Sequence, residues 1–269
     1  VDWSTAIDNS LKERGILLSW DGRTYHNPGL PEVRKHIVKV CKEIITKYDV
    51  QGLIFDDYFY PNSLPITEEA GDFNLWKESN TKLSISDWRR GNVDQMVKDV
   101  YDMVQNERPD LRFGISPAGA AGRSTWKYGL PEAPFANNDW QYEGIYSDPL
   151  SWLNSGTIDF ISPDLYDDGF KGWVAQYHLH NNPLFIPETK HMQNNGVRAF
   201  YVLGEHDAIG ISPFAIEDGS AEQGTPFVEG YEKLRELMPL ISKWQGQDAM
   251  WGLLFDQQDT ERVIEDGDL

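Results

Sequence analysis

Carboxylic acids stand directly after short apolar runs at two distant places in the sequence. Asp56 and Asp57 follow the run 53–55 (LIF), and Glu188 follows the run 184–187 (LFIP). An acid beside so apolar a run is costly unless it is hydrogen-bonded or functional. Two carboxyl groups that flank a glycosidic bond can hydrolyse it, because one protonates the leaving oxygen while the other attacks carbon or activates water. The arrangement therefore predicts Glu188 and one of the two aspartates as a catalytic pair.

Alternation along a strand sends Asp56 and Asp57 to opposite faces, so one of them is expected to face the site. We favour Asp57, because it lies further toward the following loop, and keep Asp56 as the alternative. A structural role is the competing interpretation for all three acids. The aspartates would then tie loops by hydrogen bonds, and Glu188 would be an exposed loop residue.

Aromatic residues are frequent after the same runs and in the segment 117–148. Flat rings with polar tips can cover the apolar faces of sugar rings, and core packing is their alternative role. Asp164 would orient sugar hydroxyl groups or cap a turn, and Glu205 would support the site from the end of a helix. The expected substrate-binding residues are Tyr58, Tyr60, Trp126, Trp140, Asp164, Tyr166 and Glu205.

Apolar runs that end in serine-proline or an acid recur along the chain. They lie at 53–55, 112–115, 158–161, 184–186 and 208–211, and the tripeptide Ile-Ser-Pro closes three of them. Proline cannot donate to a sheet ladder and so marks a strand end. Near-continuous apolar runs are typical of strands buried on both faces of a parallel sheet. Functional groups gather at the carboxyl ends of such strands, which is where the acids stand.

Apolar residues at helical spacing separate these runs, over 33–44, 93–104 and 231–241. Strands that alternate with helices predict right-handed βαβ units. The 269 residues fit one α/β domain, a (β/α) TIM-type barrel, since such barrels need about 250 residues. Two further strands are expected at 16–20 and 251–255.

The predicted barrel is short of strands, because six or seven are recognisable whereas closure needs eight. A strand without a clear pattern, an incomplete barrel, or a second subunit that covers the open edge would account for the difference. The third explanation predicts a homo-oligomer, since an exposed edge of an apolar sheet readily pairs with another chain.

Composition narrows the functions further. The formal net charge is −19, from 24 Lys plus Arg against 43 Asp plus Glu, and such a chain repels phosphate backbones and anionic lipids. We therefore expect a neutral carbohydrate as substrate, and neither nucleic acid nor a membrane as partner. Cys41 is the single cysteine, which excludes an internal disulfide and a cysteine-based zinc site. No metal or organic cofactor is expected. The first residue is Val1 and not Met, which indicates a trimmed chain and slightly favours a periplasmic or secreted protein.

Several segments, in order, resemble one known family. They are 25–34 (YHNPGLPEVR), 49–61 (DVQGLIFDDYFYP), 88–93 (WRRGNV), 113–117 (FGISP) and 139–142 (DWQY). Together they are similar to the bacterial glycoside-hydrolase-like barrel proteins related to family 10, over about residues 1–165. The resemblance implies a barrel whose first strand, first helix and second strand have no counterpart in this chain.

From about residue 162 the chain instead resembles the family 35-type β-galactosidases, through 182–189 (NPLFIPET) and 203–214 (LGEHDAIGISPF). In that family the glutamate of Ile-Pro-Glu is the nucleophile, which implies this role for Glu188. The family's acid/base glutamate has no counterpart, so Asp57 or Asp56 would take its role. The chain is thus interpreted as a hybrid of two related barrels that change over near 162–168, joined in nature or in a laboratory.

The favoured function is a retaining glycosidase for β-linked sugars, of the β-galactoside or β-glucoside class. Glu188 would attack the anomeric carbon, and Asp57 or Asp56 would protonate the leaving oxygen and then activate water. A catalytically inactive carbohydrate-binding barrel is the alternative. A structural role in assembly, through the open barrel edge, is a third hypothesis.

Overall fold

The computed structural model describes residues 15–56, 58–117 and 140–162, together with the backbone of short strands at 184–185, 188–189 and 212–213. The chain divides into two compact units, one of residues 1–163 and 167–183 and one of residues 164–166 and 184–269. Each unit is described by itself. The closed barrel in a single domain stays a prediction.

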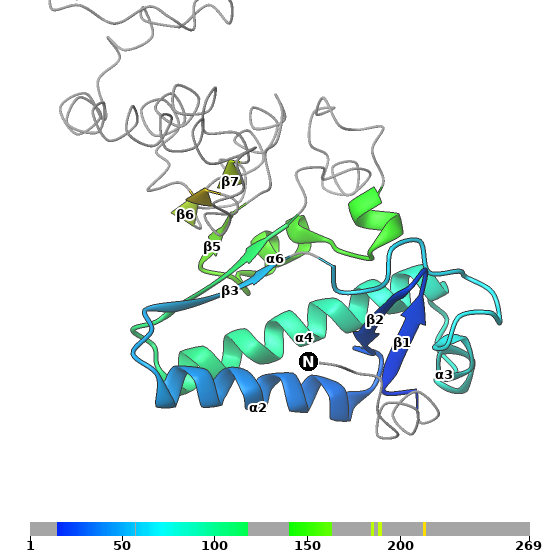
Figure 1. Cartoon of the computed structure of the whole chain (residues 1–269), viewed down its shortest axis with the longest axis horizontal. Coiled ribbons are helices and arrows are strands. Elements are labelled where there is room, and N and C mark those ends of the chain that lie inside the picture. Colours follow the sequence, from blue (N-terminus) through cyan, green and yellow to red (C-terminus); the bar gives the residue numbers. More distant parts are fainter. Residues whose placement is uncertain are drawn as a thin grey trace, which may run out of the picture. The chain divides into compact units, whose positions relative to one another are not determined.

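A parallel sheet is the centre of the first unit. β3 (Gly52–Asp56), β4 (Arg112–Ser116) and β5 (Phe160–Ile161) are neighbours in it (Figure 1). The register pairs Asp56 with Ser116 and Ile115 with Ile161. These strands coincide with apolar runs of the sequence, and two of them stop at the Ile-Ser-Pro tripeptides. The parallel pairing predicted for these runs is confirmed.

Two glycines let the strands of this sheet approach one another. A Cβ atom at Gly52 would lie 2.7 Å from the carbonyl oxygen of Arg112 on β4, and a Cβ atom at Gly114 would overlap the ring of Phe160 on β5. Only glycine avoids such contacts without a shift of the backbone or the ring.

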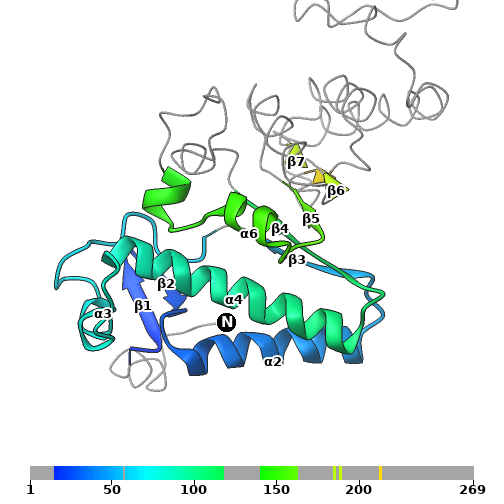
Figure 2. The ribbon, with the colours of Figure 1, turned by 180° about the vertical axis from the view of Figure 1, so that it is seen from behind.

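Two long helices, α2 (Pro31–Lys47) and α4 (Ile85–Glu107), pack side by side below the sheet in the view of Figure 1 and in the reverse view of Figure 2. Pro31 suits the first turn of α2, where its missing N–H would have no helical partner. α4 begins at an N-cap, because the Ser84 hydroxyl accepts a hydrogen bond of 3.1 Å from the backbone N–H of Asp87.

The apolar stripe predicted for α4 is confirmed, since Val93, Met96, Val97, Val100 and Val104 are all buried. The stripe of α2 differs from the prediction. Val33 is buried as expected, but Val40 is 43% exposed, and Cys41 and Ile45 take the inner face instead. Steps of four residues from Val33 reach Ile37, Cys41 and Ile45, so the predicted stripe of Val33, Ile37, Val40 and Ile44 departs from the inner face only at its last two members.

The additional strand expected at 16–20 is present and belongs to an antiparallel hairpin. β1 (Leu17–Trp20) pairs with β2 (Arg23–His26), and Trp20 lies opposite Arg23. Asp21 and Gly22 connect them with φ angles of 48° and 73°. Positive φ at both central residues is the signature of a type I′ turn, whose twist matches that of a two-stranded ribbon. The strand predicted at 16–20 is therefore confirmed, and its partner in the structure is the antiparallel strand β2.

Short helices lie in the long connections. α3 (Phe73–Glu78) precedes α4, whereas the π-helical turn η1 (Trp140–Gly144) and α6 (Pro149–Ser155) precede β5. The Asp148 side chain caps α6 by accepting a hydrogen bond of 3.2 Å from the Ser151 N–H, and Gly156 with φ 65° ends it. None of these three elements was predicted.

In the second unit, β6 (Leu184–Phe185) matches a predicted run, and β7 (Glu188–Thr189) pairs in parallel with β8 (Ser212–Pro213). The helix predicted at 231–241 and the strand predicted at 251–255 lie outside the described residues. Within the part of the chain that the structure describes, none of the helices combines the length and the apolar character that a membrane span requires.

The close strand approach at Gly52 gives a stability prediction. Gly52→Ala should lower the free energy of unfolding by about 1–3 kcal/mol, because the new methyl group meets a backbone oxygen. Gly91→Ala is the matched control: it lies inside α4 with open space around the new Cβ atom, and it should raise stability by about 0.5–1 kcal/mol. Urea denaturation measures both, and equal effects of the two substitutions would contradict the packing argument.

Candidate functional site

Polar groups line the carboxyl ends of the parallel strands. Asp56 ends β3 in register with Ser116 on β4, and Ser162 directly follows β5. The Ser116 hydroxyl donates a hydrogen bond of 2.9 Å to the carbonyl oxygen of Ser162, which ties the two strand ends together. Residues in register on parallel strands point to the same face, so Asp56, Ser116 and Ser162 share one face of the sheet.

A cavity of about 300 Å³ lies beside Asp56. Its walls come from the hairpin, both long helices and β3, and include Tyr25, His26, Ile37, Ile54, Asp56 and Tyr58. This volume is at the lower end of the roughly 300–1,000 Å³ that is common for small-molecule sites. The mixture of a carboxylate, phenol groups and an aliphatic wall can hold a ligand that is polar at its edges and apolar on its faces.

One aromatic residue of the cavity wall, Tyr58, forms a pair with a second aromatic ring. Tyr58 and Trp140 meet edge to face, with 5.4 Å between ring centroids. The indole N–H of Trp140 donates a hydrogen bond of 2.7 Å to Asn62, and the backbone N–H of Ser63 donates one of 2.9 Å to the carbonyl oxygen of Gly144. The segment after β3 and the turn η1 are thereby joined at the rings. We call Tyr58 and Trp140 the ring pair.

The backbone of Tyr58 is strained, because its φ angle is 72°. For a bulky residue this left-handed conformation costs about 1–3 kcal/mol and persists only when surrounding contacts hold it. The guanidinium group of Arg23 on the hairpin lies 5.3 Å above the Tyr58 ring. Hydrogen bonds from Arg23 to the hydroxyl groups of Tyr25 and Tyr58 raise its pKa, so it stays a cation.

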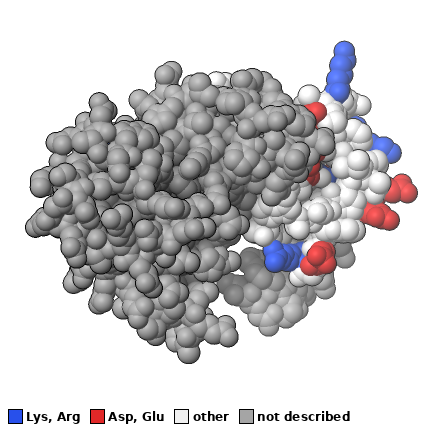
Figure 3. Space-filling model, turned by 90° about the horizontal axis from the view of Figure 1, so that it is seen from above, with Lys and Arg blue, Asp and Glu red and all other residues white. Residues whose placement is uncertain are grey.

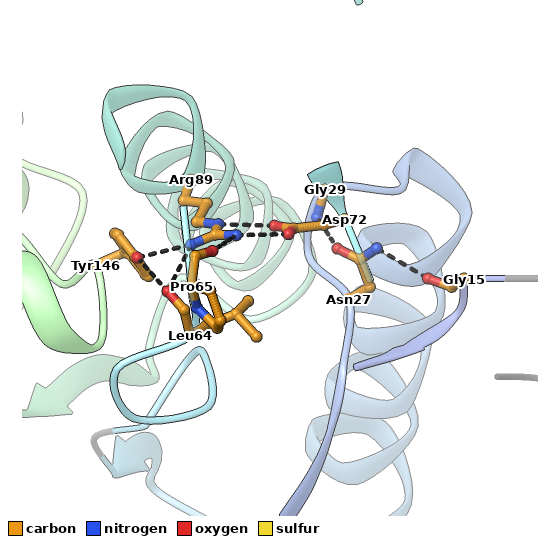
Figure 4. A network of polar contacts seen from close by, with 8 residues as sticks. All are labelled: Gly15, Asn27, Gly29, Leu64, Pro65, Asp72, Arg89 and Tyr146. Atoms are coloured by element: carbon orange, nitrogen blue, oxygen red, sulfur yellow. Dashed lines mark hydrogen bonds and ion pairs between the residues drawn. The ribbon is translucent and has the colours of Figure 1, made fainter. Parts of the chain in front are cut away.

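A buried ion pair joins α4 to the connection after β3 (Figure 4). Arg89 on α4 donates to both carboxylate oxygens of Asp72, at 2.8 and 2.6 Å, and both side chains are 0% exposed. The remaining donors of Arg89 reach the carbonyl oxygens of Leu64 and Pro65 and the hydroxyl oxygen of Tyr146. Burial alone would lower the pKa of Arg89, but the hydrogen bonds and charge of Asp72 outweigh burial and raise it.

The neighbouring arginine holds the turn η1. Arg90 donates a hydrogen bond of 2.8 Å to the carbonyl oxygen of Tyr142, and its guanidinium group lies 3.9 Å above the Tyr142 ring. Its other end group donates to Asp87 in the first turn of α4. Two successive residues of α4 therefore fix the segments that carry the ring pair.

The predicted site residues have different outcomes. Asp56 lines the cavity, and Tyr58 and Trp140 form the ring pair, while their contact with substrate stays a prediction. Tyr60 is 0% exposed and packs edge to face on Tyr146. The expected contact of Tyr60 with substrate is therefore corrected to a packing role. Glu188 begins β7 in the second unit, where its backbone pairs with Ser212. Asp57, Trp126, Asp164, Tyr166 and Glu205 lie outside the described residues.

Several residues of the site were missed by sequence reasoning. The hairpin contributes Tyr25, His26 and Arg23. Its Asp-Gly dipeptide at 21–22 is typical of a hairpin turn and could have predicted it. Arg89 stands four residues before Val93 on the buried stripe of α4, and a charge on such a stripe indicates a buried partner. That partner, Asp72, has no sequence signal of its own, because it lies in an irregular connection.

The surface around these elements carries both signs of charge. On the face seen in Figure 3, basic and acidic side chains of the described residues lie near one another, without a large patch of either sign. Exposed pairs such as Lys42 with Glu107 contribute to this mixture.

His26 gives a pH prediction. Burial, and then the charge of His36 at 5.9 Å between ring centroids, lower the pKa of His26 in the folded state. As the pH falls, the unfolded chain therefore binds the proton before the folded chain does. The free energy of unfolding is highest above the unfolded pKa of about 6.5 and decreases as the pH falls from there toward the lower folded pKa. Urea denaturation between pH 8 and 5 should show that the free energy of unfolding decreases more steeply with falling pH for the wild type than for His26→Gln. Parallel curves for the two proteins would contradict the lowered pKa.

Comparison with known proteins identifies the family. Residues 12–201 match the family described as Glycosyl hydrolase-like 10. The chain is 32% identical to the glycosyl hydrolase YngK of Bacillus subtilis (strain 168) over 169 residues, which cover 61% of this chain and 30% of that protein. It is 33% identical to the glycosyl hydrolase DigH of Escherichia coli (strain K12) over 220 residues, which cover 80% of this chain and 47% of DigH. The chain thus spans half or less of the length of these curated relatives.

The family match bears on the predicted hybrid. It continues through the expected change near 162–168 and past Glu188, up to residue 201. One family therefore accounts for both sides of the expected junction, and neither the family 35 resemblance nor a hybrid origin gains support. The part of the resemblance that rests on residues 1–165 is confirmed: this chain belongs to the Glycosyl hydrolase-like 10 family.

Proposed function

We propose that the protein is a retaining glycoside hydrolase for β-linked sugars, of the β-galactoside or β-glucoside class. The observation that carries this proposal is the cavity at the carboxyl end of β3, where the Asp56 carboxylate lies beside Tyr58 of the ring pair. Membership of a glycosyl hydrolase-like family supports the same chemistry. A sugar ring would lie with its apolar face on an aromatic ring and its hydroxyl groups toward polar partners.

The proposed reaction uses two carboxyl groups. Glu188 attacks the anomeric carbon and forms a glycosyl-enzyme, while an aspartic acid after β3 protonates the leaving oxygen and then removes a proton from the attacking water. Retention requires about 5–5.5 Å between the two carboxyl groups, whereas about 6.5–9.5 Å would give inversion. The position of Asp57 in the sequence, further toward the following loop, favours it as the acid/base residue. The cavity beside Asp56, and its register with Ser116, support Asp56 as the alternative.

Substitution of the carboxyl groups tests the reaction. Glu188→Gln should abolish release of 4-nitrophenol from 4-nitrophenyl β-galactoside or β-glucoside while sugar binding, measured by calorimetry, is retained. Whichever of Asp56→Asn and Asp57→Asn removes the acid/base should lower kcat by about 10²–10⁴-fold. Asp110→Asn, which alters an exposed ion pair with Arg108, is the control.

The outcomes separate the competing functions. Turnover that survives in Glu188→Gln and in both aspartate variants would contradict the two-carboxylate mechanism. Sugar binding without any turnover by the wild type would favour the inactive carbohydrate-binding barrel. Self-association without sugar binding would favour the structural role in assembly.

Removal of the ring pair tests substrate binding. Tyr58→Ala and Trp140→Ala should each raise KM by about 10-fold, because an aromatic contact of about 1.4 kcal/mol is lost. Trp76→Ala on α3 removes an indole that donates to the carbonyl oxygen of Leu83, away from the ring pair, and should leave KM unchanged. Equal KM values in all four proteins would remove the ring pair from the site.

A further inference from the structure

Arg89 is a buried cation, and each of its N–H donors has an acceptor. A guanidinium group has five N–H donors, and the structure gives Arg89 five hydrogen bonds: two to Asp72, one each to Leu64 and Pro65, and one to Tyr146. Apolar side chains of similar volume often stabilise a fold as well as a buried ion pair does. Stability alone therefore gives a weak reason for this pair, whereas five directed bonds define the positions of the groups that accept them.

These groups belong to the segments that carry the ring pair. Leu64 and Pro65 follow Tyr58 and Asn62 in the connection after β3, and Tyr146 follows Trp140 in the connection before α6. The Tyr146 hydroxyl accepts a hydrogen bond of 2.6 Å from Arg89 and donates one of 2.9 Å to the carbonyl oxygen of Leu64. Burial raises the pKa of Tyr146, so its hydroxyl keeps the proton that it donates.

The two segments are thus joined at two levels. The ring pair and the Trp140–Asn62 hydrogen bond join them beside Tyr58 of the cavity wall, and the Tyr146 hydroxyl joins them at Arg89. Tyr60 lies between these levels in the chain, packs on the Tyr146 ring at 5.4 Å, and has the Arg89 guanidinium group 5.8 Å from its centroid. We call Arg89, Asp72, Tyr146 and the two carbonyl groups the Arg89 clamp.

We propose that the Arg89 clamp positions the ring pair for sugar binding, and that the Tyr146 hydroxyl is the positioning group whose loss weakens substrate affinity. The inference rests on the proposed function, because it assigns the clamp to the same site. None of the clamp residues is expected to touch the sugar: Arg89 and Asp72 are 0% exposed, and Tyr146 is 2% exposed.

Tyr146→Phe tests the clamp with little change of volume. It keeps the ring packed on Tyr60 and removes only the hydroxyl group between Arg89 and Leu64. We expect KM for the 4-nitrophenyl β-glycoside with the highest turnover to rise about 3–10-fold, as the loss of a hydrogen bond to a charged group would give, with kcat within about twofold of the wild type. Tyr101→Phe, which removes a partly buried hydroxyl on α4 outside the clamp, should leave both constants unchanged.

A double-mutant cycle separates positioning from a general structural effect. If Tyr146 acts through the ring pair, Tyr146→Phe should raise KM by less than about twofold when Trp140→Ala is already present. Hydrogen–deuterium exchange should also become faster in segments 59–72 and 140–148 of Tyr146→Phe, and stay unchanged in α2.

Four results would overturn the inference. An equal rise of KM with and without Trp140 shows that Tyr146 does not act through the ring pair. Unchanged exchange in both segments shows that the hydroxyl does not hold them. Turnover by the wild type with an unchanged KM in Tyr146→Phe overturns this inference alone, whereas no turnover by the wild type overturns the proposed function and this inference with it.

Discussion

The buried contact between Arg89 and Asp72 is the constraint on which the described site depends. Transfer of two charges out of water costs several kcal/mol per ion, and the cost is offset only when geometry and further hydrogen bonds are good. Here every donor of the cation has an acceptor, so a displacement of either connecting segment would leave a buried N–H unpaired. The irregular stretch before α3 and the stretch after η1 therefore have defined positions although neither is a regular element.

The hairpin and the sheet contribute different properties to the cavity. The sheet supplies Asp56 at a position fixed by the ladder with β4, whereas the hairpin supplies Tyr25 and His26 from a ribbon outside that ladder. A carboxylate on a rigid strand suits chemistry, which tolerates little displacement. Side chains on this ribbon can be replaced without disturbing the parallel ladder, because β1 and β2 form a separate two-stranded sheet.

Much of the local structure of the first unit follows from sequence patterns. The runs closed by Ile-Ser-Pro predict β4 and β5, and the valine stripe predicts α4, because proline and helical spacing act over a few residues. The place of Asp56 and Tyr58 in one cavity agrees with the expectation that functional groups collect at the ends of parallel strands. The strand at 16–20 was predicted too, but its antiparallel partner β2 was not, because strand propensity does not show the pairing partner.

The contacts that organise the site were beyond sequence reasoning for a physical reason. Asp72 and Tyr146 reach Arg89 from connections 17 and 57 residues away, and no period links such positions. Tyr60 has the same residue type and almost the same place in the chain as Tyr58, yet one ring is buried and the other lines the cavity. The backbone of Tyr58 is left-handed, which distinguishes its conformation from that of Tyr60. A tyrosine in the sequence does not predict such a conformation.

The burial of Cys41 on the inner face of α2 has a practical consequence for spectroscopy. Burial raises the pKa of its thiol to about 11, so at neutral pH only about one molecule in 10⁴ carries the reactive thiolate. Maleimide or iodoacetamide reagents would therefore react slowly with the native chain. A cysteine introduced on the exposed surface of the hairpin could then carry a fluorophore or spin label at a single site, without prior removal of the natural thiol.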